Sequence, residues 1–133
     1  MSSNNPDETE ALLALNQRLL DSISQADWLT YASLCDPTLT AFEPEASGQL
    51  VEGLKFHEYY FTNARPATPV NSTMASPQVR LLGDTAIVTY TRLTQRLAAD
   101  GKAQTDALNE TRVWHRQGGS WKHVHFHRSK VER

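Results

Sequence analysis

The sequence predicts a single α+β domain that spans residues 1–133, with helices in the first half and a sheet in the second. Near the N-terminus, Leu12, Leu15, Leu19 and Ile23 recur at the spacing of one helix face. From Val70 onward, β-rich segments alternate with glycine-containing turn pairs, which is typical of an antiparallel meander. Helices followed by a meander describe a fold in which the helices cover one face of the sheet.

Two helices are expected at the start of the chain. The first runs from about Pro6 to Ser24, with Asn5 in position to cap it. The second is shorter, because Asp27 can cap its start and Asp36-Pro37 ends it. The polar and acidic residues 1–8 are expected to be flexible.

Short elements and then long strands follow the helices. Leu39 to Phe42 and Gln49 to Val51 should form a small hairpin, because Pro44 and Gly48 punctuate the segment between them. The aromatic run from Leu54 to Phe61 favours a short helix. The main loop and four strands complete the order: Arg65 to Pro69, then Val70 to Leu82, Thr85 to Leu97, Thr105 to Arg116 and Trp121 to Arg128.

The composition excludes several classes of partner. The chain has 39% hydrophobic and 21% charged residues and a formal net charge of -2, so it offers no polybasic field to nucleic acid or anionic lipid. No apolar run approaches the roughly 20 residues that a membrane span needs. Cys35 is the only cysteine, so no intramolecular disulfide can form. We expect a cytoplasmic protein that binds neither nucleic acid nor a membrane.

Familiar catalytic motifs are absent. The sequence has no glycine-rich phosphate loop, no His-Glu-x-x-His, no Gly-x-Ser-x-Gly and no kinase motif, and it is too short for a kinase domain. We therefore assign no catalytic residue and no cofactor. Tyr31, His57 and the pair Glu43/Glu45 could act as acids or bases in a cavity, but core packing and solvated charge explain them at least as well.

Three arginines fall on mostly apolar strand faces, because residues two apart point to the same side of a sheet. The pairings are Arg92 with Val88 and Tyr90, Arg112 with Trp114, and Arg128 with Val124 and Phe126. An unpaired buried guanidinium costs several kcal/mol, so an anion should lie near each. Two interpretations stay open. Either Glu43, Glu45, Glu52 or Glu110 supplies the charge internally, or the arginines line a cavity that accepts a carboxylate.

Three histidines, His123, His125 and His127, are also spaced two residues apart, so they share a parity: a regular strand would point all three to the same side of the sheet. They could be metal ligands, but their spacing along one strand spreads the ring nitrogens too far for one ion, and we expect no metal. The other interpretation is a polar sheet face, which His115 and Trp121 join by parity. Such a mixture of aromatic rings and imidazoles suits contact with another subunit.

Several segments, in order from about Glu10 to Ser129, resemble one known family. They include Cys35-Asp36-Pro37, Leu39 to Ala46, Leu50 to Gly53, Phe56-His57, Tyr60-Phe61, Arg92 to Gln95, Glu110 to Arg116 and Val124 to Ser129. In these segments the chain resembles the association (hub) domain of calcium/calmodulin-dependent protein kinase II. No kinase or calmodulin-binding segment precedes them, so we expect a freestanding homologue or a fragment.

The resemblance implies a cone-shaped fold of the nuclear transport factor 2-like, or SnoaL-like, type, with a long N-terminal helix packed in a strongly curved antiparallel sheet. It also implies self-association into a large homo-oligomer, with a stacked ring as one form and a dimer as the minimum. A pocket lined by Arg92, Arg112 and Arg128, beside Tyr31 and His57, would accept a small anion or carboxylate. The alternative function is a freestanding small-molecule-binding protein or an enzyme of the ketosteroid isomerase-like type.

Overall fold

A computed structural model describes residues 6–63 and 70–131 of the chain. Residues 6–8 are already helical, while residues 1–5, including the expected cap Asn5, lie outside the described residues. The main loop expected at residues 65–69 also lies outside them. None of the helices in the described ranges has the length and apolarity to cross a membrane.

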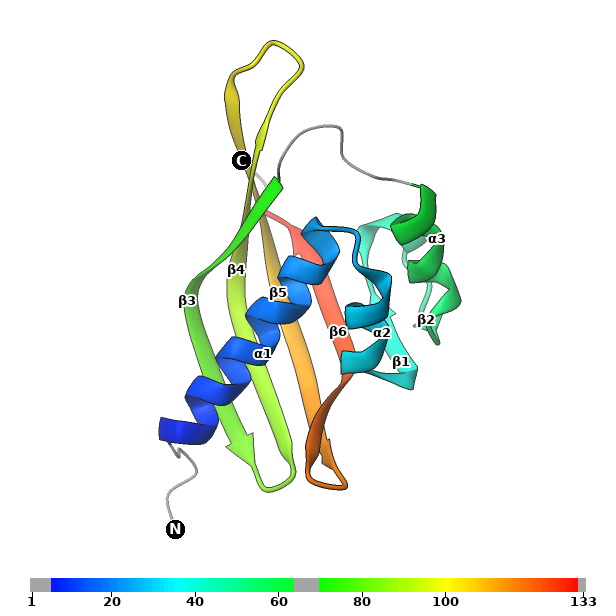
Figure 1. Ribbon diagram of the computed structural model, residues 1–133, viewed down its shortest axis with the longest axis vertical. Coiled ribbons are helices and arrows are strands. Elements are labelled where there is room, and N and C mark those ends of the chain that lie inside the picture. The colour runs from blue at the N-terminus through cyan, green and yellow to red at the C-terminus, as the bar shows by residue number, and fades with distance from the viewer. Residues whose placement is uncertain (1–5, 64–69, 132–133) are drawn as a thin grey trace.

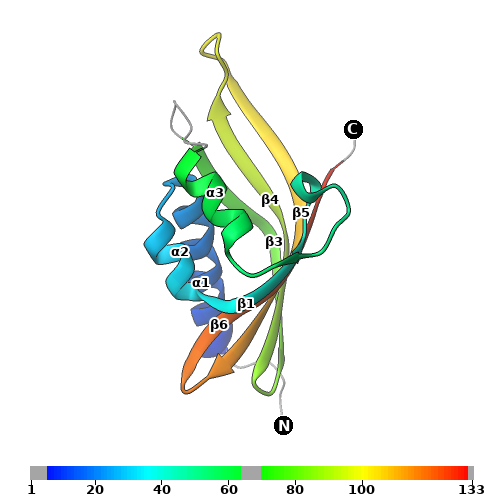
Figure 2. The same ribbon diagram turned by 90° about the vertical axis from the view of Figure 1, so that its right-hand side faces the viewer.

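The two N-terminal helices form as the sequence predicts. Helix α1 (Pro6–Ser24) buries Leu12, Leu19 and Leu20 completely, and helix α2 (Trp28–Leu34) follows a short turn. The Oδ1 atom of Asp27 accepts the backbone N–H of Thr30 at 3.2 Å, which confirms the predicted cap. Both helices lie on the same side of the sheet, and α1 runs obliquely across it (Figures 1 and 2).

The sheet has six strands in the order β2-β1-β6-β5-β4-β3. Their bounds are β1 (Cys35–Phe42), β2 (Val51–Glu52), β3 (Val70–Leu82), β4 (Thr85–Leu97), β5 (Ala103–Gln117) and β6 (Ser120–Lys130). Strands β3 to β6 form the predicted antiparallel meander, and β1 and β2 form a hairpin as predicted, although β2 begins at Val51 and not at Gln49. The α+β prediction is therefore confirmed.

One pairing differs from the prediction of an antiparallel sheet. Strand β1 pairs with β6 in parallel, so the sheet is mixed. Strand β1 also begins at Cys35, four positions before the predicted start. A parallel pair requires a long crossover, and here α3 and β3 to β5 lie between the two strands in sequence. Hydrophobic periodicity describes each strand separately and contains no information about such distant pairing.

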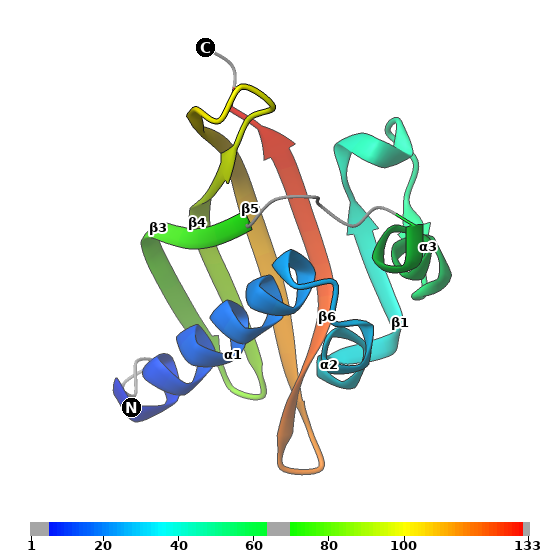
Figure 3. The same ribbon diagram turned by 45° about the horizontal axis from the view of Figure 1, so that its top comes forward.

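The connection between β1 and the meander carries two helical segments. The 3-10 helix η1 (Pro44–Ala46) follows β1, and Ser47 and Gly48 turn the chain with positive φ angles of 52° and 85°. The predicted short helix is α3 (Lys55–Asn63). Figure 3 shows α3 beside β1, on the far side of α2 from α1. This segment closes the end of the space between the helices and the sheet.

A bulge in β6 reverses the predicted orientation of one histidine. Trp114 pairs with His123 and Val113 with His125, so the strand contains one extra residue, Val124. His123 consequently faces the core and is fully buried, while His125 lies on the opposite face. The predicted row of three histidines on one face is therefore wrong for His123.

The same register corrects the prediction for Trp121. It pairs with Arg116 and packs against the hydrophobic core, on the side of the sheet that carries His123. His115 pairs with Lys122 and is exposed. Trp121 and His115 therefore lie on opposite faces.

Candidate functional site

A cavity of about 260 Å³ lies between the helices and the sheet. All five residues that the sequence analysis singled out line it, and they come from five elements. Tyr31 lies on α2, His57 on α3, Arg92 on β4, Arg112 on β5 and Arg128 on β6. The three arginines lie on the adjacent strands β4, β5 and β6, on the face of the sheet that the helices cover (Figure 1).

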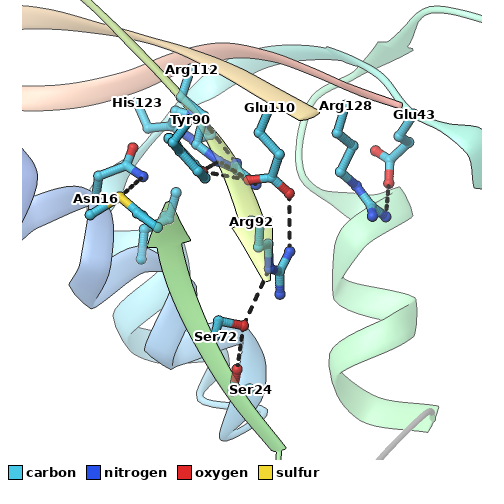
Figure 4. Close-up of polar contacts among 12 residues, drawn as sticks. Asn16, Ser24, Glu43, Ser72, Tyr90, Arg92, Glu110, Arg112, His123 and Arg128 are labelled. Atoms are coloured by element: carbon cyan, nitrogen blue, oxygen red, sulfur yellow. Dashed lines mark hydrogen bonds and ion pairs between the residues drawn. The ribbon is translucent and has the colours of Figure 1, made fainter. Parts of the chain in front are cut away.

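Glu110 joins two of the arginines (Figure 4). Its Oε2 lies 3.2 Å from Arg92 Nη1, and its Oε1 accepts from Arg112 Nε at 3.1 Å and Nη2 at 3.0 Å. Tyr90 donates its hydroxyl to the same Oε1 at 2.5 Å. Burial acts to raise the pKa of Glu110, but Arg112 and Arg92 outweigh it and hold that pKa at about 2. The carboxylate is therefore ionised at neutral pH.

Arg112 is a buried member of this cluster, with only 1% of its surface exposed. Its guanidinium lies 4.4 Å from the centre of the Phe126 ring, and Nη1 lies 3.4 Å from His123 Nε2. Burial opposes its charge, but the attraction of Glu110 prevails and raises the pKa of Arg112 above its ordinary value. Arg112 thus contacts the Glu110 carboxylate, the His123 imidazole and the Phe126 ring at the same time.

His123 and Cys35 continue the cluster into the core. The Cys35 sulfur lies 3.5 Å from His123 Nδ1. Burial, followed by the charge of Arg112, lowers the pKa of His123 well below its ordinary value, so the imidazole is neutral. Burial raises the pKa of Cys35 to about 12, which keeps the thiol protonated and poorly nucleophilic. Neither group offers reactive chemistry at neutral pH.

Arg92 links the cluster to the helix side. Its Nε donates to Ser72 Oγ at 3.2 Å, and that hydroxyl lies 3.2 Å from the hydroxyl of Ser24 on α1 (Figure 4). Together with the Glu110 contact, these bonds use Nε and Nη1, and within residues 6–63 and 70–131 the N–H groups of Nη2 have no hydrogen-bond acceptor. Burial lowers the pKa of Arg92, although the group remains a cation.

Arg128 has a separate pair of acidic partners. Its Nη2 lies 2.7 Å from Glu45 Oε1 and 3.4 Å from Glu43 Oε1. Glu43 also bonds His57, whose Nε2 lies 2.5 Å from Oε2. Burial acts to raise the pKa of Glu43, but the bonds from His57 and Arg128 lower it overall. This carboxylate is ionised and holds α3 and β6 together.

One polar atom in the cavity wall has no partner. His57 Nδ1 is buried and makes no hydrogen bond with any described residue. Because Nε2 lies against a carboxylate, it carries the proton in the neutral ring and Nδ1 is an acceptor. Tyr31 packs beside it, with ring centroids 6.1 Å apart, and burial raises the pKa of its phenol well above the ordinary value.

Both interpretations of the arginines therefore apply to the same residues. Glu43, Glu45 and Glu110 supply internal charge, whereas Glu52 is exposed on β2 and is absent from the cavity wall. Sequence reasoning missed the roles of Ser72 and His123. Ser72 contacts Arg92 across neighbouring strands, which the alternation along one strand does not reveal, and the alternation placed His123 on the wrong face.

The described residues contain no group of three or more histidine, cysteine, aspartate or glutamate side chains arranged to hold a metal. His125 and His127 instead belong to the outer face of the sheet, on the side away from the helices. There the Thr40 hydroxyl lies 2.7 Å from His125 Nδ1, and the Phe42 ring contacts both imidazoles at centroid distances of 6.2 and 5.6 Å. Partial burial, followed by His127, lowers the pKa of His125.

Comparisons with known proteins agree over almost the whole chain. Residues 8–132 match the family model described as the calcium/calmodulin dependent protein kinase II association domain. The delta subunit of this kinase from Oryctolagus cuniculus is 45% identical over 123 residues, which are 90% of this chain and 23% of the kinase. The chain thus spans about a quarter of the length of that relative.

Solved structures give the same result. The CaMKII hub homology domain from Chlamydamonas reinhardtii is 50% identical to this chain with a TM-score of 0.88, and the alignment covers 94% of this chain and 99% of that one. The association domain of CaMKII from C. elegans is 43% identical with the same TM-score, and the alignment covers 93% of this chain and 96% of that one. A nuclear transport factor 2-like protein from Salmonella enterica, 20% identical with a TM-score of 0.76 over 93% of this chain and 91% of that one, confirms the predicted fold type.

Proposed function

Because this chain belongs to the family of calcium/calmodulin dependent protein kinase II association domains, we propose that it is a self-association module that forms a homo-oligomer. The match of residues 8–132 to an association domain is the observation that carries this proposal. The alternative, a freestanding enzyme of the same fold, rests only on likeness of fold, which does not determine function.

The outer face of the sheet is the surface that suits a contact between copies. Two rows of side chains cross β1, β6, β5 and β4 without a lysine, arginine, aspartate or glutamate. The rows are Thr40, His125, Val113 and Ile87, and Phe42, His127, Thr111 and Thr89. Interface centres are depleted of charge in this way, and a two-fold contact uses the same patch on both copies.

A charge placed in the middle of these rows tests the surface. Thr111→Arg on β5 would bury a guanidinium against its symmetry mate, so it should lower the mass of the assembly measured by light scattering. Thr105→Arg, on the exposed part of the same strand, is the matched control and should leave the mass unchanged. An unaltered mass in Thr111→Arg would exclude this face as the contact.

A large assembly requires more than this one contact. A two-fold interface alone closes at a dimer, while a ring needs a second, heterologous surface. We propose a large homo-oligomer of the stacked-ring type, which the family relationship favours. A mass of twice 14.9 kDa at all concentrations would restrict the chain to the minimum, a dimer.

We further propose that the cavity binds a small carboxylate. Arg92 and Arg128 offer charged donors, and the aromatic side chains of Tyr31, Phe61 and Phe126 also line the cavity. An aromatic carboxylate such as benzoate combines both features. Calorimetric titration should detect benzoate and give a much weaker signal with benzamide, which has the same shape without the charge; equal binding of the two would contradict an anion site.

A further inference from the structure

Positive and negative charges balance in and beside the cavity wall. Among the described residues, three arginines face it, and each is paired with glutamate: Arg92 and Arg112 with Glu110, and Arg128 with Glu43 and Glu45. A carboxylate that entered with all three glutamates in place would add an uncompensated negative charge in a partly buried space. Binding of an anion therefore becomes favourable when one glutamate leaves its arginine.

The three glutamates differ sharply in their freedom to leave. The side chains of Glu110 and Glu43 are 0% and 3% exposed, and both are held by further hydrogen bonds from Tyr90 and His57. The side chain of Glu45 is 38% exposed, and among the described residues Arg128 is the one ion-pair partner of its carboxylate. Glu45 can exchange this contact for water, whereas the other two would become buried, unpaired anions.

The backbone around Glu45 allows the same movement. It belongs to η1, a single 3-10 turn, and every residue from Pro44 to Leu50 is exposed except the half-buried Ala46. Ser47 and Gly48 follow in the left-handed region. A side chain on such a short, solvated turn can rotate away without disturbing the core.

The ion pair also lies between two hollows. Glu45 and Arg128 line the cavity beneath the helices, and both line a second, larger hollow beside β5 and the end of β6 as well. The pair is thus part of the wall that the two spaces share. If Glu45 moved away, Arg128 would become accessible from the second hollow, which Lys130 also lines.

From these contacts we propose that Glu45 is an internal competitor that occupies Arg128 until a carboxylate ligand displaces it. This proposal rests on the carboxylate-binding function proposed above and adds its regulation. The ligand takes the place of Glu45 on Arg128, and Glu45 turns into solvent. Removing the charge of Glu45 should therefore strengthen binding, although most changes in a binding-site wall weaken it.

Titration of benzoate into the wild type and Glu45→Gln tests the proposal. We expect Glu45→Gln to bind benzoate about two- to five-fold more tightly, the range set by the strength of a partly exposed ion pair. Glu52→Gln removes the same charge from an exposed position on β2, outside the cavity wall, and should bind like the wild type. The double variant Glu45→Gln/Arg128→Gln should lose the gain.

The outcomes separate this proposal from the one it rests on. If the wild type binds benzoate and Glu45→Gln binds it equally or more weakly, Glu45 is not a competitor while the carboxylate site stands. If neither protein binds benzoate although both unfold at the wild-type temperature, the carboxylate site itself is wrong. Tighter binding that survives in the double variant would also overturn the role of Arg128.

Discussion

Glu110 links three other side chains of the buried polar network. It accepts hydrogen bonds from Arg92, Arg112 and Tyr90 at once, and its carboxylate is completely buried. Forming a buried ion pair costs desolvation free energy, so the pair itself adds little to stability. Removing one partner, however, strongly destabilises the fold. Removal of one arginine then leaves the buried carboxylate with less compensation for its charge.

Arg112→Ala should accordingly destabilise the fold by about 3–5 kcal/mol, because it leaves Glu110 with one guanidinium in place of two. Urea unfolding followed by tryptophan fluorescence measures the change. Arg96→Ala is the control, since Arg96 pairs with Asp106 at 2.7 Å on the surface and should change stability by less than about 1 kcal/mol. Equal effects of the two substitutions would contradict the buried role of Arg112.

Acidification should destabilise the fold through His123. In the unfolded chain a histidine titrates near 6.5, whereas burial and Arg112 lower the pKa of His123 in the folded state well below that value. The contribution of His123 to the free energy of unfolding is fully present above about pH 6.5. Below this pH the unfolded state takes up a proton that the folded state does not. Stability then falls by up to about 1.4 kcal/mol per pH unit.

The variant His123→Leu isolates this effect. Urea unfolding between pH 7.5 and 5 should show a shallower decline for His123→Leu than for the wild type, whereas His115→Gln, at an exposed position, should retain the wild-type slope. Parallel curves for the wild type and His123→Leu would assign the acid sensitivity to other groups.

Residue by residue, the sequence identifies the arginines but not their complete surroundings. Parity places Arg92 and Arg112 on the inner face, because β4 and the middle of β5 are regular. It fails for His123, because the extra residue Val124 shifts the alternation and leaves no pattern that identifies it. Glu110 forms ion pairs with both Arg92 and Arg112. These pairs depend on distances between neighbouring side chains, which the alternation along one strand does not reveal.

At the scale of elements, the start and end signals of the helices are the most predictable features. The α1 bounds agree with the helical spacing, and the capping aspartate of α2 was identified from its position before an apolar run. The long strands of the meander agree closely because glycine turns separate them. The parallel contact of β1 with β6 was not predicted, since it joins distant segments by tertiary packing.

Loss of the α2 cap gives a prediction at this scale. Asp27→Ala should destabilise the fold by about 1 kcal/mol, because the backbone N–H of Thr30 would lose its acceptor. Asp27→Asn keeps an acceptor at the same place and should retain most of the stability. Thermal unfolding of the two variants checks the order, and equal losses would show that charge, and not capping, stabilises this end of α2.

In the molecule as a whole, the two faces of one curved sheet serve the two proposed roles. The inner face and the helices enclose the arginines with their glutamates, while the outer face presents the two rows around Thr111 and His127. The two roles should therefore be separable by substitution. Glu45→Gln should alter ligand binding without changing the mass, and Thr111→Arg should do the opposite.

Self-association is the central claim, and the absolute mass of the wild-type protein tests it most directly. Light scattering after size-exclusion chromatography, over a wide range of protein concentrations, should give a mass many times the 14.9 kDa of one chain. A mass of 14.9 kDa at every concentration would contradict the claim.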